Sequence, residues 1–136
     1  MGTKNRVYIG IVTNLILHCI RNKFFRKELY VTKTKYNKIK IDHPDEHKHL
    51  NINDFQKFID TTIGYCLYQK HENIFNFVSL YNDNYYIYSI STNNHYLEMG
   101  TFFRASAKRL KKCIKEEIQF FNDNHKINFD EYLNKN

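Results

Sequence analysis

Residues 41–50, IDHPDEHKHL, combine three histidines and three acidic residues with the only proline of the chain. Histidine binds transition metals and also exchanges protons near neutral pH, so a dense group of histidines and carboxylates can serve either chemistry. Acids and histidines are also common in the solvated first turn of a helix. The stretch is therefore a candidate metal site, a candidate source of an acid/base group, or a solvated helix start.

His43 and His47 are four residues apart, the spacing that directs two ligands at one ion on a continuous helix. Pro44, however, suits the first turn of a new helix and places His43 at its cap, outside regular helix. No group of cysteines or histidines elsewhere supplies the remaining ligands at a recognisable spacing. We therefore expect no metal and no cofactor, and we expect His47 and His49 to be solvated. His43 remains a candidate acid/base group, with a purely structural role as the alternative.

A second candidate site lies in residues 100–115, GTFFRASAKRLKKCIK, where an expected strand gives way to a helix. Thr101, Arg104 and Ser106 fall at this junction, and two hydroxyls, a planar guanidinium and the free amides of a helix start all suit a phosphate group. The stretch holds six basic residues and no acidic one. A solvated, lysine-rich helix face is the alternative. Gly100 predicts a strand bend or the close approach of another backbone.

The net charge of +7 is unevenly distributed along the chain. Residues 1–50 carry eleven basic and four acidic groups, and residues 101–136 carry eight and five, whereas the middle of the chain is acidic. If the two basic ends are adjacent in the fold, they form one positive surface suited to phosphate. An ordinary lysine-rich surface is the alternative.

The pattern of apolar residues predicts helices and strands in the first half and a run of strands in the second. In the first half the expected elements are a strand at 6–12, a helix at 13–22 capped by Thr13 or Asn14, a strand at 24–32, one or two helical turns at 33–41 with Tyr36, Ile39 and Lys40 facing inward, and a helix at 51–62. In the second half they are strands at 74–81, 85–91 and 96–103, then a helix from 105 with Ala107, Leu110, Ile114, Ile118 and Phe121 on its inner face. The tyrosines and phenylalanines of these strands are assigned to packing rather than to base stacking. The polar tail at 122–136 is expected to fray or to form one last turn.

These elements predict a small single α+β domain over residues 1–136, with a core of about 6–121. An antiparallel meander forms its sheet, and the helices pack on one face. The three cysteines are odd in number and far apart, which favours reduced thiols in a cytoplasmic protein. The apolar run at 9–20 is too short to span a membrane, so no membrane contact is expected.

In their order along the chain, these segments resemble the phage-associated branch of the barnase–EndoU–colicin–RelE-like (PBECR-type) nuclease superfamily. The matching pieces are YIGIVTNLIL (8–17), ELYVTKTKYNKIKIDHPDE (28–46), DFQKFIDTT (54–62) and GTFFRASAKRLKK (100–112). The resemblance covers about residues 6–115. It implies a RelE/barnase-like fold and a toxin- or phage-type RNA endonuclease that needs no metal. In such an enzyme the ribose 2′-hydroxyl attacks the adjacent phosphate and leaves a cyclic phosphate and a 5′-hydroxyl.

The resemblance also implies roles for individual residues. His43 would be the acid/base group, Lys38 and Arg104 would stabilise charge, and Thr101 and Ser106 would bind or orient the phosphate. Four further basic residues would bind RNA along the same surface: Lys35, Lys40, Lys108 and Arg109. The expected partners are RNA, with transfer RNA as a candidate, and a cognate inhibitor or a host protein.

The chain departs from the family pattern at two places. Lys38 stands where family members often carry a histidine, and TTIGY (61–65) stands where an Asn-Pro pair often follows the helix. Lysine is a poor base at neutral pH unless its surroundings lower its pKa. The alternative function is therefore a catalytically inactive module on the same scaffold, which binds RNA or a host protein as a phage inhibitor or adaptor would.

Overall fold

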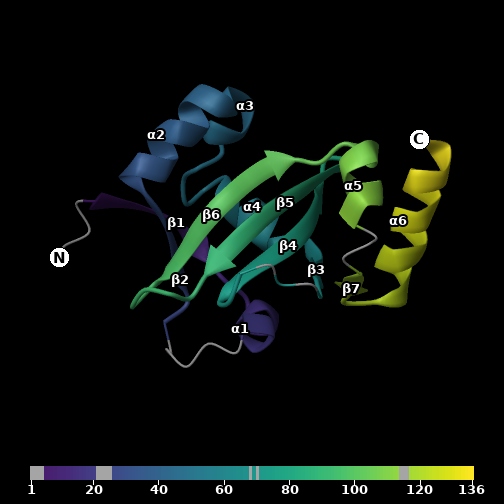
Figure 1. Ribbon diagram of the computed structural model, residues 1–136, viewed down its shortest axis with the longest axis horizontal. Helices are drawn as coiled ribbons and strands as arrows, with labels where there is room; N and C mark the ends of the chain where they lie inside the picture. Colours follow the sequence, from purple (N-terminus) through teal and green to yellow (C-terminus); the bar gives the residue numbers. More distant parts are fainter. Residues whose placement is uncertain (1–4, 21–25, 68, 70, 114–116) are drawn as a thin grey trace.

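The computed structural model describes residues 5–20, 26–67, 69, 71–113 and 117–136. The described strands are β1 (Arg6–Ile11), β2 (Glu28–Thr32), β3 (Thr62–Cys66), β4 (Ile74–Tyr81), β5 (Asn84–Ser91), β6 (Leu97–Arg104) and β7 (Ile118–Phe120). The described helices are α1 (Asn14–Ile20), α2 (Lys33–Asp42), α3 (Pro44–His47), α4 (Phe55–Asp60), α5 (Ala107–Cys113) and α6 (Asp123–Lys135) (Figure 1). The predicted α+β class and single domain are confirmed.

All seven strands belong to one sheet in the order β1-β2-β6-β5-β4-β3-β7. Its centre is the predicted antiparallel meander of β4, β5 and β6, in which every residue of β4 faces one of β5. Alternating aromatic and β-branched residues make these strands predictable, because each strand must bury side chains on both of its faces. The hairpin of β1 and β2 extends the meander at one end, and β3 and β7 extend it at the other.

The join between β2 and β6 is parallel and very short. It consists of the pairs Leu29 with Leu97 and Tyr30 with Glu98. The strand β2 then stops at Thr32, whose hydroxyl oxygen accepts a hydrogen bond from the backbone N–H of Lys35 and so caps α2. After Glu98, no described strand pairs with the edge of β6 that faces β2. The helix α2 lies beside this edge instead. The candidate site forms at this edge.

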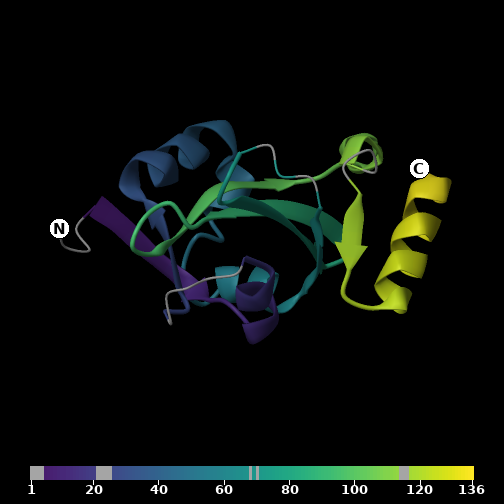
Figure 2. The same ribbon diagram turned by 60° about the horizontal axis from the view of Figure 1, so that its bottom comes forward.

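The sheet is curved, with α1 and α4 on one side of it and α5 and α6 on the other (Figures 1 and 2). Two apolar clusters cover its opposite faces. In β5, Tyr88 and Ile90 belong to the cluster that contains α1, α2 and α4, whereas Tyr85 and Ile87 belong to the cluster that contains α5 and α6. This division follows from strand alternation. The expectation that helices cover only one face is wrong, because α5 and α6 pack on the second face.

The predicted inner face of a continuous helix from 105 to 121 is wrong in its last part. The helix α5 ends at Cys113, Ile114 lies outside the described residues, and Ile118 belongs to β7. Glu117 has a φ of 53°, a left-handed conformation that a helix does not contain. The chain then turns into β7, which pairs with β3.

The tail does not fray as predicted; it forms the thirteen-residue helix α6. The Asn122 side chain accepts a hydrogen bond from the backbone N–H of His125 at 2.9 Å and begins this helix. Phe129 and Leu133 are buried in the second cluster. The apolar core therefore continues past residue 121 to Leu133.

Smaller differences occur in the first half. The predicted helix at 51–62 is shorter, because residues 62–66 form β3. In place of the one or two turns predicted at 33–41, the ten-residue helix α2 continues to Asp42, and Lys40 is exposed rather than facing inward. The helix α1 begins after Thr13, whose hydroxyl oxygen accepts from the backbone N–H of Ile16 at 3.2 Å. Of the predicted strand at 24–32, the first two residues lie outside the described part.

None of the three cysteines forms a disulfide; Cys66 and Cys113 are buried and Cys19 is partly buried. Burial raises the pKa of the Cys19 thiol above its usual value. The helix α6 is the longest one described, and no described helix has both the length and the apolar content that a membrane-spanning segment requires.

Candidate functional site

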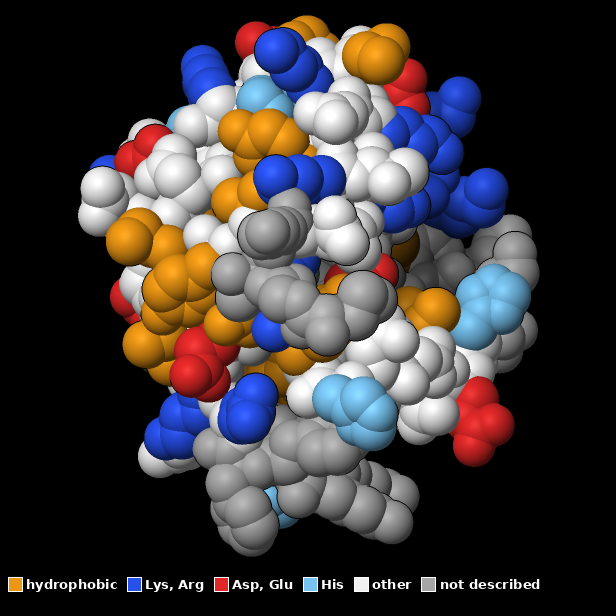
Figure 3. All heavy atoms as spheres, turned by 90° about the vertical axis from the view of Figure 1, so that its left-hand side faces the viewer, with side chains coloured by type: hydrophobic (Ala, Val, Ile, Leu, Met, Phe, Trp, Pro, Cys, Tyr) orange, Lys and Arg blue, Asp and Glu red, His pale blue; other side chains and the backbone are white. Residues whose placement is uncertain are grey.

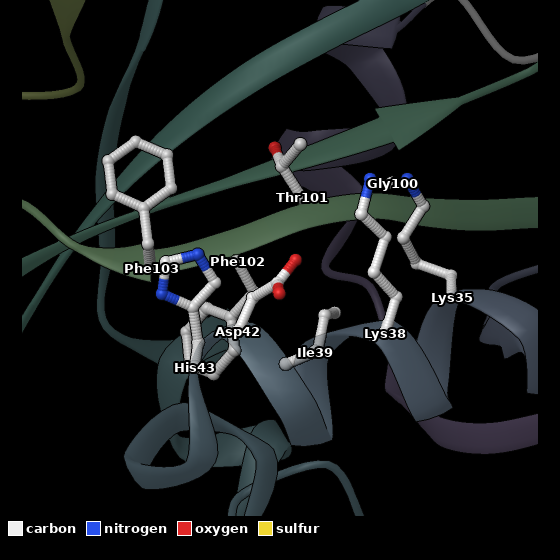
Figure 4. Close-up of a pocket in the computed structure, with 9 residues that line it drawn as sticks. All are labelled: Lys35, Lys38, Ile39, Asp42, His43, Gly100, Thr101, Phe102 and Phe103. Carbon is white, nitrogen blue, oxygen red and sulfur yellow. The ribbon is translucent and has the colours of Figure 1, made fainter.

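A cleft of about 200 Å³ lies between α2 and the edge of β6 that β2 leaves open (Figure 4). The residues that line it come from two stretches almost sixty positions apart in the sequence. They are Lys35, Lys38, Ile39, Asp42, His43, Gly100, Thr101, Phe102 and Phe103. The cleft is open at the protein surface, so a ligand can enter it without a change in the fold.

The helix α2 supplies one wall through a regular helical stripe. Lys35, Lys38, Ile39 and Asp42 are spaced i, i+3, i+4 and i+7, which places them on one face. Ile39 is buried in the first apolar cluster and holds this face against β6. The two lysine ammonium groups and the Asp42 carboxylate point toward β6 (Figure 4). Lys40 lies outside the cleft.

Neither lysine of the stripe forms an ion pair with any described acid, although Asp42 lines the same cleft. Two ammonium groups and one carboxylate give the wall a net positive charge. Lys and Arg side chains also gather on the upper part of the molecule, where Figure 1 places α2 (Figure 3). The wall is therefore suited to an anion.

His43 lies at the junction of two helices, as Pro44 predicted. Its backbone N–H donates to the Ile39 carbonyl at 2.7 Å and ends α2, and its carbonyl accepts from Glu46 and His47 at 3.1 and 2.9 Å and begins α3. Both backbone groups are used, so the residue is held firmly although it is outside regular helix. Its side chain is half exposed and lines the cleft.

The His43 side chain has an acidic neighbour that the sequence analysis did not identify. Its Nδ1 lies 3.5 Å from Oε2 of Glu46, a carboxylate that is only 14% exposed. A carboxylate in this position orients an imidazole and leaves Nε2 available to a ligand. The missed signal is the three-residue spacing between His43 and Glu46 across the proline, which places both side chains on one side of the α3 turn.

The strand β6 supplies the opposite wall, and it bulges there. Tyr88 pairs with Phe102 and Ile90 with Met99, so two residues of β6, Gly100 and Thr101, lie opposite the single Ser89 of β5. A Cβ on Gly100 would lie 2.8 Å from the Ser89 hydroxyl oxygen, which explains glycine at this position. The bulge confirms the strand bend predicted at Gly100, whereas the atom that approaches this glycine closely belongs to the Ser89 side chain and not to another backbone.

Ser89 anchors Thr101 at the bulge. The hydroxyl oxygen of this buried serine accepts from the backbone N–H of Thr101 at 2.9 Å and from its side-chain hydroxyl at 3.1 Å. Thr101 is exposed at the rim of the cleft, opposite α2. The structure thus brings His43, Lys38, Lys35 and Thr101 together around one space.

Arg104 and Ser106 do not line this cleft. Arg104 lies close to Tyr86: burial raises the pKa of this phenol, the Arg104 guanidinium acts in the opposite direction, and the Glu46 carboxylate adds to the rise. Arg104 is therefore a positive charge on the Glu46 side of the site. The Ser106 hydroxyl accepts from the backbone N–H of Arg109 at 3.2 Å and caps α5, which explains this serine by helix capping.

The two basic residues predicted on α5 differ in their surroundings. Arg109 places its guanidinium 5.2 Å from the centre of the Phe103 ring, and Phe103 lines the cleft. Lys108 is exposed and is not among the residues that line the cleft. Arg109 is therefore connected to the site through one aromatic ring.

The other histidines of the opening stretch have separate, packed environments, so the expectation that they are solvated is wrong. The His47 ring lies 4.3 Å from the Tyr36 ring, and the His49 ring lies 5.2 Å from the Phe58 ring. Burial is the main cause that lowers the pKa of His49 below its usual value. Within the described part of the chain, no three metal-binding side chains converge on one point.

Asp42 lines the cleft and was also missed by sequence reasoning. Its signal was the helical spacing from Lys35, which could be recognised only once α2 was known to extend to residue 42. Phe103 was missed for a different reason, because the aromatic residues of the strands were assigned to packing.

Comparisons with protein-family models, with curated proteins and with solved structures returned no match to this chain.

Proposed function

We propose that this chain is a metal-independent RNA endonuclease of the toxin or phage type, with its active site in the cleft between α2 and β6. The observation that carries the proposal is the convergence of His43, Lys38 and Thr101 on one positively charged space. A proton-exchanging group, fixed cations and a hydroxyl suffice for cleavage that uses the 2′-hydroxyl of RNA itself. The RelE/barnase-like assignment and a cytoplasmic location belong to this proposal.

In the proposed reaction the ribose 2′-oxygen attacks the adjacent phosphorus. A bond from phosphorus to the 2′-oxygen forms, and the bond from phosphorus to the 5′-oxygen of the next nucleotide breaks. The products are a 2′,3′-cyclic phosphate and a 5′-hydroxyl. The 2′-hydroxyl must lose a proton and the leaving 5′-oxygen must gain one, so the site needs a base and an acid.

Asp42 and His43 line the cleft side by side in the sequence and can divide these two tasks. The Asp42 carboxylate accepts the proton of the 2′-hydroxyl, and protonated His43 gives a proton to the 5′-oxygen. Glu46 stabilises the protonated imidazole through Nδ1. In the nuclease family that the chain resembles, a histidine often stands at the position of Lys38. In this assignment the Asp42 carboxylate, one helical turn later on α2, takes the place of that histidine.

The remaining groups act on charge. Lys35 and Lys38 offset the charge that develops on the phosphate oxygens during attack, and Thr101, whose N–H and hydroxyl both donate to Ser89, bounds the phosphate site on the β6 side. Arg104 contributes from outside the cleft as a nearby positive charge. Because Ser106 caps α5, this mechanism requires no contact between it and the phosphate.

The proposal is tested by incubating the protein with transfer RNA and total RNA in EDTA, with His43→Ala beside it. His18→Ala, which removes an exposed histidine far from the cleft in the sequence, is the matched control. We expect cleavage by the parent and by the control, fragments that end in a cyclic phosphate, and a loss of at least about 100-fold in rate for His43→Ala. Intact RNA with the parent protein at high concentration would rule out the enzyme.

A second candidate function is an inactive module that binds RNA or a host protein. Lys38 favours it, because this residue supplies charge to the cleft but is a poor proton acceptor. Salt-sensitive retention of RNA without cleavage would support the RNA-binding form. Specific binding of one host protein or cognate inhibitor, with no retention of RNA, would support the protein-binding form.

A further inference from the structure

Phe103 occupies an unusual place at the rim of the cleft. It lines the space that Lys35, Lys38 and His43 share, and its side chain is only partly buried. The second apolar cluster packs against it, and the Arg109 guanidinium lies 5.2 Å from the centre of its ring. The ring is thus held in place from one side while it contributes to the wall of an open cleft.

The ring and Thr101 belong to the same side of β6. They are two residues apart, so strand alternation directs their side chains to one face about 7 Å apart, as Figure 4 shows for their direction. The ring thus lies beside a cleft whose two lysines suit a phosphate. A nucleotide presents a matching pair of groups, a phosphate and a flat base.

We propose that Phe103 is the stacking platform for one unpaired nucleobase of the strand whose phosphate occupies the cleft. Bases stack on aromatic side chains whatever their sequence, and a neighbouring guanidinium adds to the attraction for the base and the backbone. The ligand is therefore single-stranded nucleic acid, since the bases of a duplex are already stacked on each other. The inference rests on the proposed function only in taking an RNA phosphate as the ligand of the cleft.

The test uses binding, so that it does not depend on cleavage. The probe is a short fluorescent oligonucleotide of 2′-O-methyl RNA, which has no free 2′-hydroxyl and cannot be cut by the proposed reaction. It is compared with the same backbone without bases and with a duplex of the same sequence. We expect the protein to bind the single strand about tenfold more tightly than either of the other two, the range that one stacked base supplies.

Two substitutions at Phe103 separate stacking from packing. Phe103→Leu keeps an apolar side chain against the second cluster but removes the ring, and we expect it to abolish the preference for bases. Phe103→Tyr keeps the ring and should keep the preference. Phe75→Leu, at another partly buried phenylalanine outside the cleft, is the matched control and should bind as the parent does. Thermal unfolding of each variant verifies that it is folded.

Equal affinity for the base-containing and base-free strands would overturn the inference, as would a preference that Phe103→Leu retains or an absence of binding to every probe. These outcomes are independent of the test for cleavage. A protein that cuts RNA but binds both strands equally keeps the proposed function and loses the stacking platform. A protein that prefers bases through Phe103 but never cuts RNA keeps the platform and loses the enzyme.

Discussion

Nδ1 of His43 lies 3.5 Å from Oε2 of Glu46 across the first turn of α3. Pro44 begins this turn between them, and the backbone of His43 is hydrogen-bonded to both helices that it joins. The contact therefore belongs to a firmly held junction rather than to a loose surface pair. It connects the half-exposed imidazole of the cleft to a carboxylate that is mostly withdrawn from solvent.

This relationship predicts that Glu46→Gln slows RNA cleavage without weakening RNA binding. Glutamine keeps the size of the side chain but lacks the charge that stabilises the protonated imidazole. We expect kcat to fall about 10- to 100-fold, the usual effect of removing an outer partner, with KM nearly unchanged. Steady-state kinetics measure the two parameters. Asp45→Asn, at the exposed neighbouring acid, should change neither, and an unchanged kcat in Glu46→Gln would contradict the role of Glu46.

The two lysines at positions 38 and 40 provide a matched pair for the electrostatic contribution of the cleft. Both are exposed, but Lys38 lines the cleft and Lys40 lies outside it. We expect Lys38→Ala to weaken RNA binding and to reduce by about one the slope of log affinity against log salt concentration. Lys40→Ala should leave both quantities nearly unchanged. Equal effects of the two substitutions in a salt titration would show that the whole helix surface, and not the cleft, attracts the phosphate.

The C-terminal helix supplies a stability prediction that is independent of function. Phe129 is 2% exposed in the second cluster, whereas Ile127 on the same helix is 52% exposed. Phe129→Ala should lower the free energy of unfolding by about 3–5 kcal/mol, because it removes a buried ring and leaves a cavity. Ile127→Ala should change it by less than about 0.5 kcal/mol. Urea unfolding measures both, and similar values for the two would mean that α6 is not part of the cooperative core.

The packed environment of His49 predicts a loss of stability in mild acid. Burial against Phe58 lowers the pKa of His49 in the folded chain, so the unfolded chain takes up the proton first as the pH falls. The stability that neutral, buried His49 contributes is fully present above the ordinary histidine pKa of about 6.5. It is lost as the pH falls below 6.5 toward the lower pKa that His49 has in the folded chain.

The variant His49→Leu keeps an apolar contact with Phe58 and cannot titrate. Its loss of stability between about pH 7.5 and about pH 5.5, on either side of the ordinary pKa, should be smaller than that of the parent. Urea midpoints at the two pH values measure the difference. His18→Leu, at an exposed histidine, should keep the parental loss, and an identical loss in all three proteins would exclude His49 as a cause.

Local sequence patterns predicted the parts of the fold that local forces determine. The meander followed from strand alternation, and the break at His43 followed from Pro44. The helix α6 was missed although Phe129 and Leu133 have helical spacing after the cap Asn122, because its many polar residues concealed the two apolar positions. The strands β3 and β7 are short and acquire their shape from pairing with neighbouring strands, β3 with both β4 and β7, and β7 with β3.

Some members of the candidate site were predictable from the sequence, but Asp42 and Phe103 were missed and the boundaries of the cleft were not predictable. His43 and Thr101 were named from their chemistry and Lys38 through the family resemblance, but their convergence depends on the pairing of β2 with β6, which no local pattern reveals. Arg104 was expected at the centre and lies outside the cleft. A one-residue bulge at Gly100 and Thr101 decides which β6 side chains face α2, and a bulge of this kind depends on the buried Ser89 of the partner strand.

The short parallel join between β2 and β6 also determines when the site can assemble. Its two pairs, Leu29 with Leu97 and Tyr30 with Glu98, each span 68 positions of the sequence. Contacts of such long range close late in folding, because the intervening chain must first lose much of its freedom. During synthesis α2 must wait for β6, which ends only when about three-quarters of these 136 residues have been made. A chain that cuts RNA would thus stay harmless through most of the translation of its own message.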